Sequence, residues 1–441
     1  MNHRLASQFE LLQKENALLR ERLAKHGIPK NSRNSSLAPS SDMNPPKRNQ
    51  SLRKKTGRKP GGQLGREGKT LEMVADPDHI EDFLPQYCTV CGKDISDVPS
   101  RPEERRQVVD IPPIRAKVTE YRSYSRVCPC GNCTIGQFPS SAVSSICYGP
   151  NIEAMAGYLH TRQYLPYKRM AELFGNLLGT PISQGGIRLL LGRFALKALP
   201  AYQEIRRRIS GSPIVGSDET GAKVNGERHW FWTWQNKSLT YIAHSPSRSS
   251  TAVTDNFPSG LPKSILVHDC WNPQRSTPGK AHQICLAHLL RDIEYLKHRF
   301  PKERWPVDIG SLLSDAIELS REGPAPKERS VHLSDRLQKL IQDPPEKDRK
   351  ELFAFYRRIR KEQGNLFTFL KHHGVPFDNN ASERAIRNIK VKQKISGQFK
   401  TEKGAREFAI IRSVIDTTIK NGQNVLEALS LIAKLEPQTL G

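Results

Sequence analysis

Three acidic residues that are far apart in the chain have the type and surroundings of a metal-dependent catalytic site. Asp218 and Asp269 each end a short run rich in β-branched residues, at 214–217 and 265–268, and Glu383 stands at the expected start of a helix. Such runs predict buried parallel strands, and reactive groups gather beyond the carboxyl ends of these strands. Three converging carboxylates repel one another unless cations join them, and hard oxygen ligands suit Mg²⁺. We therefore predict that Asp218, Asp269 and Glu383 are catalytic and hold two Mg²⁺ ions, an arrangement suited to phosphoryl transfer.

Glu383 also has a purely structural interpretation. If Asn380 is the N-cap of its helix, Glu383 occupies the third helical position and completes a capping box. A capping role and a metal-binding role do not exclude each other, so both stay open at this point.

The segments around these carboxylates predict an α/β domain. Alternating runs follow Ile214, and a Ser-rich helix start near 249–250 precedes the run that ends at Asp269. The order strand, strand, strand, helix, strand is typical of a ribonuclease-H-like fold, so we place a catalytic core of this fold at residues 211–400. A charged helical insertion is expected over about 294–376. The alternating tryptophans are interpreted as core and not as a base-stacking platform; they are Trp230, Trp232 and Trp234.

The composition favours a polyanionic partner. The chain has 441 residues and a formal net charge of +24, enough length for two or more domains and a charge typical of nucleic-acid-binding proteins. No apolar run reaches the length of a membrane span, and the polar start is unlike a signal peptide. Eight cysteines, five of them grouped, favour a metal site in a reducing compartment over a disulfide framework. We expect a cytoplasmic protein that is nucleoid-associated when it binds DNA.

The positive charge is concentrated in two segments. Residues 47–69, within an expected flexible linker at 28–75, hold nine Lys or Arg and one acid, and residues 384–406 hold eight and one. A charge run is often only a solvated segment, but on a chain this basic we favour contact with DNA phosphates. The expected DNA-binding residues are Arg53, Lys54, Lys55, Arg58, Lys59, Arg66, Arg384, Arg387, Lys390, Lys392 and Lys394.

Paired cysteines predict a structural zinc module at residues 76–146. Cys88 and Cys91 form a C-x2-C-G knuckle, and the second cluster is Cys128, Cys130 and Cys133. Two knuckles at this separation, with a β-hairpin expected between them at 108–109 and 116–124, fit one Zn²⁺ held by four of the five thiolates. Pairing Cys128 with Cys130 keeps the Cys-Gly turn, whereas pairing Cys130 with Cys133 keeps the two-residue spacing.

The remaining segments are expected to be helical. Residues 1–27 carry a short heptad pattern with Asn16 at one a position, which favours a coiled coil in a homodimer or higher oligomer over a helix packed on its own chain. Residues 147–210 have helix–turn–helix spacing, although a plain helical connector explains them equally well. Residues 401–441 form a C-terminal helical region. Cys285 and His288, three apart on an expected helix, are interpreted as packing or supporting groups.

The chain resembles the transposases of the insertion-sequence-66 family over nearly its whole length. The motifs that carry the resemblance are the zipper-like start, the segments 30–36, 39–42 and 58–63, the cysteine knuckles, 148–150, 165–166 with Arg169, 218–220, 285–291 and 379–385. Two departures are the segment 270–273, where the family usually has a Tyr-containing segment, and the compressed second knuckle.

The resemblance implies a transposase with a DDE core, in which Asp218, Asp269 and Glu383 are the metal-binding triad. Its expected partners are the terminal inverted repeats of a bacterial insertion sequence, target DNA and accessory proteins of the same element. Its expected reactions are phosphodiester hydrolysis followed by strand transfer. The alternative is a transposase-derived protein that binds DNA without chemistry, and the intact triad favours the enzyme.

Overall fold

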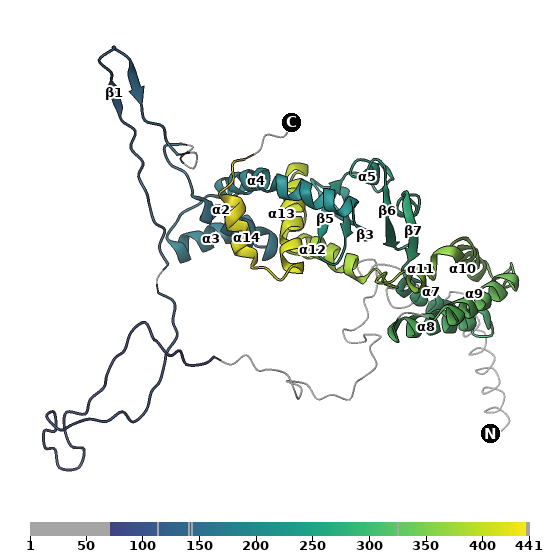
Figure 1. Ribbon diagram of the computed structural model, residues 1–441, viewed down its shortest axis with the longest axis horizontal. Coiled ribbons are helices and arrows are strands. Elements are labelled where there is room, and N and C mark those ends of the chain that lie inside the picture. Colours follow the sequence, from purple (N-terminus) through teal and green to yellow (C-terminus); the bar gives the residue numbers. More distant parts are fainter. Residues whose placement is uncertain (1–70, 113, 140–141, 143, 324–325, 438–441) are drawn as a thin grey trace, which may run out of the picture. The chain divides into compact units, whose positions relative to one another are not determined.

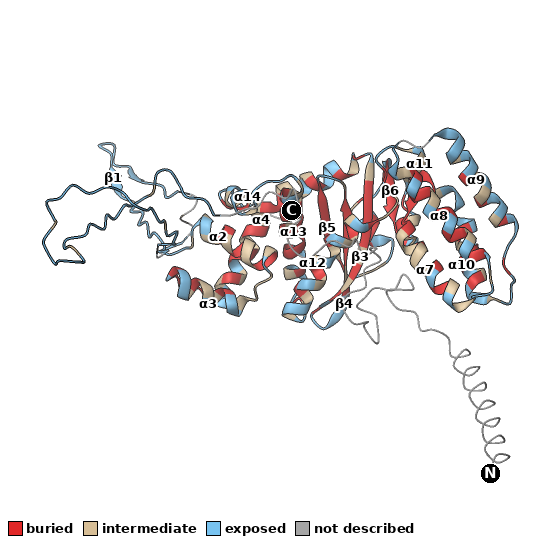
Figure 2. Cartoon of the chain, turned by 90° about the horizontal axis from the view of Figure 1, so that it is seen from below, coloured by how far each residue is buried: buried red, intermediate tan, exposed pale blue. Residues whose placement is uncertain are grey.

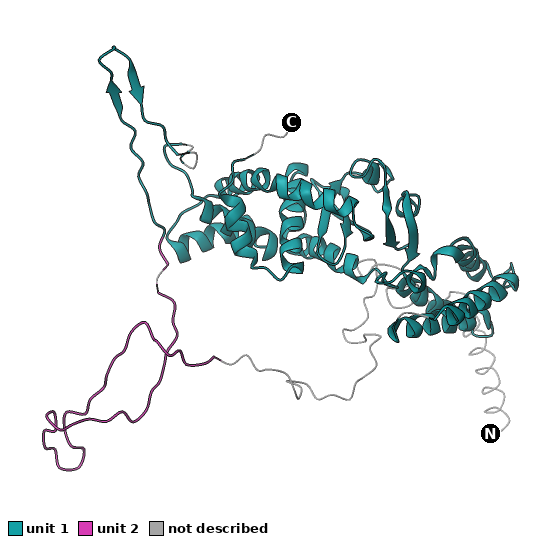
Figure 3. Ribbon diagram, in the orientation of Figure 1, with its two compact units in different colours: residues 1–45, 116–441 teal, residues 46–115 magenta. Residues whose placement is uncertain are grey.

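The computed structural model describes residues 71–437 except 113, 140–141, 143 and 324–325 (Figure 1). The expected coiled coil at 1–27 and the basic residues from Arg53 to Arg66 lie outside the described residues. The chain divides into two compact units, Pro46–Arg115 and a larger one that contains Ala116–Gly441 (Figure 3). We describe each unit by itself.

Residues 71–115 contain almost no regular structure in their described part, apart from a bridge between Tyr87 and Asp94. The expected hairpin strands at 108–109 and 116–124 are wrong, because both segments are extended without strand pairing. The larger unit instead begins with an antiparallel pair, β1 (Ser125–Val127) and β2 (Cys133–Ile135). A short hairpin therefore encloses the second cysteine cluster.

A five-stranded sheet forms the centre of the larger unit. Its strands are β3 (Ile214–Val224), β4 (Glu227–Gln235), β5 (Thr240–Ser245), β6 (Leu261–His268) and β7 (Gly279–Ile284). They lie in the order β5-β4-β3-β6-β7, with β3, β4 and β5 antiparallel and with β6 and β7 parallel to β3. The parallel strand β6 can follow the meander only through a crossover, and this connection contains the short helix α5 (Thr251–Thr254). The order of these elements along the chain, three strands, a helix and a strand, is the one expected from the sequence.

The turn chemistry and the aromatic residues explain the meander. Asn225 and Gly226 both have positive φ, 50° and 85°, as a tight Asn-Gly turn between right-twisted strands requires. Trp232 and Trp234 on β4 are fully buried, as expected, and stack with their ring centroids 6.0 Å apart. Trp230 lies at the rim of the sheet and is half-buried, so the core interpretation is correct for two of the three tryptophans.

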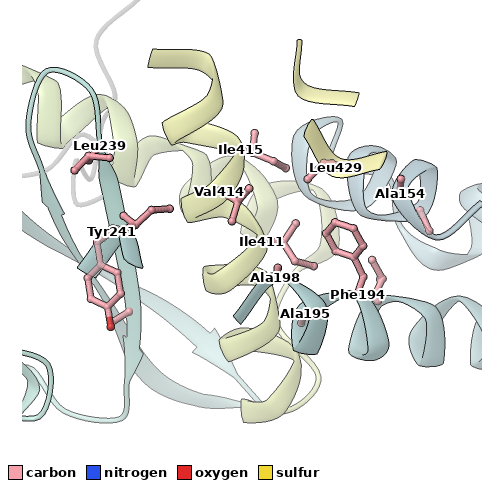
Figure 4. Packing of buried hydrophobic residues seen from close by; sticks show 14 of the residues in the cluster. Ala154, Phe194, Ala195, Ala198, Leu239, Tyr241, Ile411, Val414, Ile415 and Leu429 are labelled. Atoms are coloured by element: carbon pink, nitrogen blue, oxygen red, sulfur yellow. The ribbon is translucent and has the colours of Figure 1, made fainter. Parts of the chain in front are cut away.

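Helices cover one face of the sheet and extend beyond it. They are α2 (Pro150–Gly157), η2 (Tyr158–Arg162), α3 (Tyr167–Leu178), α4 (Gln184–Ser210), α13 (Glu402–Lys420) and α14 (Val425–Ala433). Gly179 ends α3 with φ 59°, and Ser183 caps α4 by accepting the Gly186 N–H. Apolar residues of these helices, such as Phe194 and Ile411, form one core with Tyr241 of β5 (Figure 4). Trp232 and Trp234 belong to the same core.

A second helical group separates Asp269 from Glu383 in the chain. Beyond α6 (Asn272–Arg275) and β7 it comprises α7 (Leu286–Arg299), α8 (Trp305–Arg321), α9 (Lys327–Gln342), α10 (Lys350–Lys361), η3 (Gln363–Asn365) and α11 (Thr368–Lys371). Its core continues from Ile265 and Val267 of β6 into Leu312 and Leu352. The buried faces of α7, α8 and α10 turn toward one another in Figure 2. None of the helices in the described part is long and apolar enough to cross a membrane.

Helix α12 (Asn380–Ser396) packs on the other face of the sheet, where Ile389 meets Ala222 and Phe231. Lys392 lies on this inner side of α12. It is only 4 % exposed, and its Nζ lies 3.4 Å from His160 Nδ1. Lys392 therefore does not fit the predicted DNA contact, because its ammonium group is inside the protein.

The burial of Lys392 generates a stability prediction. Burial lowers the pKa of Lys392 to about 8 from the usual 10.5, so the folded state binds this proton less tightly than the unfolded state. The free-energy cost of burying the protonated Lys392 is complete below pH 8 and disappears as the pH rises through 8 toward 10.5. We expect Lys392→Met to raise the unfolding free energy at pH 7 by on the order of 1–3 kcal/mol, with a gain that shrinks above pH 8. Thermal melting between pH 6.5 and 10 checks this.

Lys394→Met, on the exposed side of the same helix, is the matched control and should change the melting temperature little. A Lys392→Met protein that melts below wild type at pH 7 would contradict the prediction.

Candidate active site

Asp218 lies within a strand and not at its end. β3 pairs with the parallel strand β6 only as far as Gly216, which faces Val267. It continues to Val224 because the antiparallel strand β4 keeps pairing with it, and this corrects the expectation that Asp218 ends its strand. Asp218 is still two residues beyond the parallel pairing, and Asp269 follows directly after β6. The two carboxylates therefore occupy the carboxyl-end edge of two adjacent parallel segments.

Glu383 reaches this edge from the first turn of α12. The N-cap of α12 is Asn379, and it makes no side-chain capping bond, so the expected capping box with Asn380 as its cap is wrong. The Asn379 side chain instead donates from Nδ2 to the Ser217 carbonyl at 2.8 Å and to Asp269 Oδ1 at 3.3 Å. One buried amide thus joins β3, the end of β6 and the start of α12.

The absence of a side chain at Gly216 permits this close approach. A Cβ atom there would lie 2.5 Å from Gln235 Nε2, 2.7 Å from Ser382 Oγ and 3.1 Å from Asn379 Oδ1. Distances under 3.0 Å force neighbouring atoms to move. Glycine is therefore required where α12 crosses β3.

His288 on α7 lies between the second and third carboxylates. Its Nε2 is 3.3 Å from Asp269 Oδ2 and 3.7 Å from Glu383 Oε1, and its Nδ1 is 3.3 Å from Cys285 Sγ. Cys285 is buried and accepts the backbone N–H of Asn379 at 3.2 Å. These two residues support the carboxylates, as interpreted from the sequence, although His288 contacts two of them directly.

The cations around Glu383 leave its oxygens loosely held. Arg291 Nη2 is 3.5 Å from Glu383 Oε1, and Arg387 Nη2 is 3.6 Å from Oε2. Charge-assisted hydrogen bonds are usually about 2.7–2.9 Å long, so neither contact is a tight pair. The Glu383 carboxylate therefore keeps lone pairs for another ligand.

Asp218 is the least compensated of the three acids. It is 6 % exposed, and its Oδ1 accepts the Glu219 N–H at 2.8 Å. Burial, and then the negative charges of Asp269, Glu219 and Glu383, raise the pKa of Asp218 well above its usual value. No described Lys, Arg or His forms an ion pair with it. Burying an unpaired carboxylate costs free energy, so such a group either takes up a proton or pairs with a cation.

Glu219, next in the chain, has the opposite environment. Strand alternation puts it on the other face, where Arg248 Nη2 is 2.6 Å from its Oε1 and Gln274 Nε2 donates to its Oε2 at 2.7 Å. Arg248 itself stacks on Trp230 and Trp271, 4.7 and 3.7 Å from the ring centroids. Burial raises the pKa of Glu219 to about 7, with Arg248 opposing the shift. Glu219 therefore has a cationic partner in Arg248, whereas Asp218 has none among the described residues.

The basic residues predicted to bind DNA on α12 divide between its two sides. Arg384, Arg387 and Lys394 are exposed, and with Val391 they follow the helical repeat along one face. Lys390 is half-buried and donates to the Gly221 carbonyl, and Lys392 is buried as described above. The exposed face begins beside Glu383.

The two cysteine clusters have related turns, and the second turn is one residue shorter than the first. Gly92 N–H donates to the Cys88 carbonyl at 2.9 Å, and Gly131 N–H donates to the Cys128 carbonyl at 2.8 Å. Both glycines have left-handed φ, 73° and 88°, and each directly follows a cysteine. Cys133 lies instead in β2, opposite Val127.

In both turns, backbone N–H groups point at sulfur. They lower the pKa of the Cys88 thiol, through Cys91 and Val90, and that of the Cys130 thiol, through Asn132. Lower thiol pKa values favour the thiolate form that binds metal.

The sequence did not predict that Asn379 and His288 contact the carboxylates directly. The sequence contains a Cys-x2-His spacing at 285–288 and an Asn pair before Ser382, but neither pattern is specific. Their contacts with Asp269 depend on the fold, because Asn379 is 110 residues away from it in the chain.

Comparison with protein families identifies two parts of the chain and a third match of unknown function. Residues 145–407 match the family described as Transposase IS66 family, and residues 85–131 match the zinc-finger binding domain of transposase IS66. Residues 3–72 match a family of unknown function (DUF6444). A comparison with curated proteins gave no match. Since the first match covers more than half of the sequence, the chain belongs to the IS66 family of transposases.

Proposed function

We propose that this transposase cleaves DNA at the ends of its insertion sequence and joins the freed 3′-hydroxyl to target DNA. Asp218, Asp269 and Glu383 are then the DDE residues, and they hold two Mg²⁺ ions. The observation that carries the proposal is the buried Asp218 carboxylate, which lies beside two further acids and forms no ion pair with any described Lys, Arg or His. The intact triad favours an enzyme over a protein that only binds DNA.

The residues present fit the proposed metal. Carboxylate oxygens are the hard ligands that Mg²⁺ selects, and the open lone pairs of Glu383 allow it to share a cation with Asp269. When bound, a metal pair activates the attacking oxygen and stabilises the leaving oxygen of a phosphodiester. Asn379 and His288 hold the Asp269 carboxylate in place through Oδ1 and Oδ2.

The topology supports a ribonuclease-H-like core. A three-stranded antiparallel meander is followed by parallel β6 and β7. The first acid lies in β3, and the second follows directly after the neighbouring strand β6. The third acid comes from a helix that packs on the same sheet face as Asp218. In this fold the helical group between β7 and α12 is an insertion.

We place DNA along the exposed face of α12. Arg384, Arg387 and Lys394 continue from Glu383, so a strand held by their phosphate contacts lies next to the carboxylates. The basic residues from Arg53 to Arg66, outside the described structure, supply further contacts to the inverted repeats or target DNA. We infer the homodimer or higher oligomer from the heptad pattern of residues 1–27. Accessory proteins encoded by the same element are further proposed partners.

We propose that one structural Zn²⁺ binds Cys88, Cys91, Cys128 and Cys130. The zinc-finger match at 85–131 contains these four cysteines and ends before Cys133. In both clusters a left-handed glycine directly follows the second cysteine, Cys91 or Cys130, and this supports the same choice over the Cys130–Cys133 pair, although the second turn is one residue shorter.

The triad is tested by removing one charge at a time. Asp218→Asn, Asp269→Asn and Glu383→Gln should each lower cleavage at least about a thousandfold, because a metal supplies several kcal/mol of transition-state stabilisation. DNA binding should stay close to wild type. Full-length protein is incubated with Mg²⁺ and DNA that carries the element's ends, and nicks are counted on a denaturing gel.

Glu219→Gln is the matched control, since the glutamine carbonyl can still accept from Arg248, and its NH2 group can donate to Gln274 Oε1 once the Gln274 amide turns over. It should cleave within about tenfold of wild type. Equal inactivity of Glu219→Gln and Asp218→Asn would refute the assignment of these neighbours.

The α12 face is tested through the salt dependence of binding. Replacing Arg384, Arg387 and Lys394 together by Ala should weaken DNA binding and flatten the plot of log affinity against log salt. Each lost phosphate contact lowers the slope by about 0.9, so a change of about 2–3 is expected. Lys392→Met, on the buried side, should leave the slope unchanged. A triple variant with the wild-type slope would rule out this DNA path.

The zinc ligands are tested by single substitutions. Cys88→Ser, Cys91→Ser, Cys128→Ser and Cys130→Ser should each lower the bound zinc by one ion per chain and make residues 80–145 sensitive to protease, since thiolate zinc contributes folding free energy. Cys133→Ser should keep the ion and the protease resistance. Metal analysis and limited proteolysis measure both. Loss of zinc in Cys133→Ser, with retention in Cys128→Ser, would reverse the pairing.

A further inference from the structure

A second group of metal-ligand side chains lies outside the carboxylate site. His229 of β4, His244 of β5 and Glu402, the first residue of α13, bring three ligand atoms within 4.8 Å of one another. None of the three belongs to the candidate active site or to the cysteine clusters.

The sheet register explains why the two histidines meet. Phe231 pairs with His244, so His229, two residues before Phe231, is the diagonal neighbour of His244 on the same sheet face. Their rings stack with centroids 5.1 Å apart and planes 13° apart, and His229 Nδ1 faces His244 Nε2 at 3.0 Å. Two ring nitrogens with this separation can bind one ion or share one hydrogen bond.

Helix α13 supplies the third group. Thr401 caps α13 by accepting the Gly404 N–H at 3.0 Å, which fixes Glu402 at the start of the helix. The strands and the helix lie side by side, as β5 and α13 in Figure 1 show. Glu402 is exposed, so its carboxylate can move to close a coordination shell around the histidines.

The surroundings of His244 favour a neutral imidazole. Burial lowers the pKa of His244 to about 4, and the charges of His229 and Arg406 act in the same direction while Glu402 opposes them. A neutral imidazole is the form that binds metal. On the outer side of His229, Nε2 is 3.9 Å from Glu227 Oε2, where a carboxylate can orient the ring of a metal ligand.

We infer that His229, His244 and Glu402 form a zinc-binding site that clips the start of α13 to the β4–β5 edge of the sheet. Two imidazole nitrogens and one carboxylate oxygen are a common ligand set for zinc, and water completes the tetrahedron. The ion would replace the hydrogen bond between the two rings. The site is independent of the proposed DNA chemistry and of the cysteine module.

Metal binding by the full-length protein tests this inference. After chelation and dialysis against zinc, wild type should hold one ion more than His244→Gln or Glu402→Gln, and affinity at this site should fall at least about tenfold in each variant. Cobalt substitution separates the sites, because the cysteine module gives intense sulfur-to-cobalt absorption and this site gives only weak bands. Cys88→Ser should therefore lose the intense absorption and keep the weak bands.

Glu427→Gln, an exposed acid in the first turn of α14, is the matched control and should bind zinc as wild type does. Circular dichroism without zinc checks that the variants fold, and exposed Glu402 provides a test if a histidine variant does not. Zinc should raise the melting temperature of wild type and Cys88→Ser by the same step, and this step should be absent in Glu402→Gln. If His244→Gln and Glu402→Gln bind as much zinc as wild type, the two histidines share only a hydrogen bond.

Discussion

The repulsion around Asp218 is the constraint on which the site depends. Keeping this buried carboxylate ionised next to Asp269 and Glu383 costs free energy unless a cation pairs with it. Among the described residues, its only hydrogen-bond partner is a backbone N–H. The arrangement persists because other contacts fix the backbone. Asn379 is 1 % exposed and ties Ser217 to Asp269, while Gly216 leaves room for α12 to cross β3. The Asn379 amide and the missing side chain at Gly216 therefore bring the three acids together, while cations contact only Glu383, loosely, and no described cation pairs with Asp218.

Local patterns in the sequence predicted the helices around the core well. The start of α3 follows Pro166, and Gly179 ends this helix through its left-handed backbone. Ser183 caps the start of α4 with its side chain. Asp269 was placed correctly for a similar reason, since β6 ends where its apolar run ends. The ends of helices and strands such as these depend on residues that are close together in the sequence.

Three of the failures involve partners that are distant in the sequence. β3 runs past Asp218 because β4 pairs with it, and a strand's apolar run does not reveal how far its neighbour extends. The capping box expected with Asn380 as N-cap does not form, because the N-cap is Asn379 and its side-chain amide donates to Ser217 and Asp269. Lys392 lies in a basic run but on the side of α12 that faces His160. Helical periodicity predicted two faces, and only the packing determined which face was buried.

Helix α12 couples the two halves of the proposed reaction. Its first turn carries Glu383, its outer face carries Arg384, Arg387 and Lys394, and its inner face packs through Ile389 against β3 and β4. Asn379 fixes the start of the helix, and the packing of Ile389 fixes its inner face. A DNA strand bound along the outer face is then positioned by the same rigid element that positions the carboxylate. Binding and chemistry need no separate alignment step, because one helix determines the geometry of both.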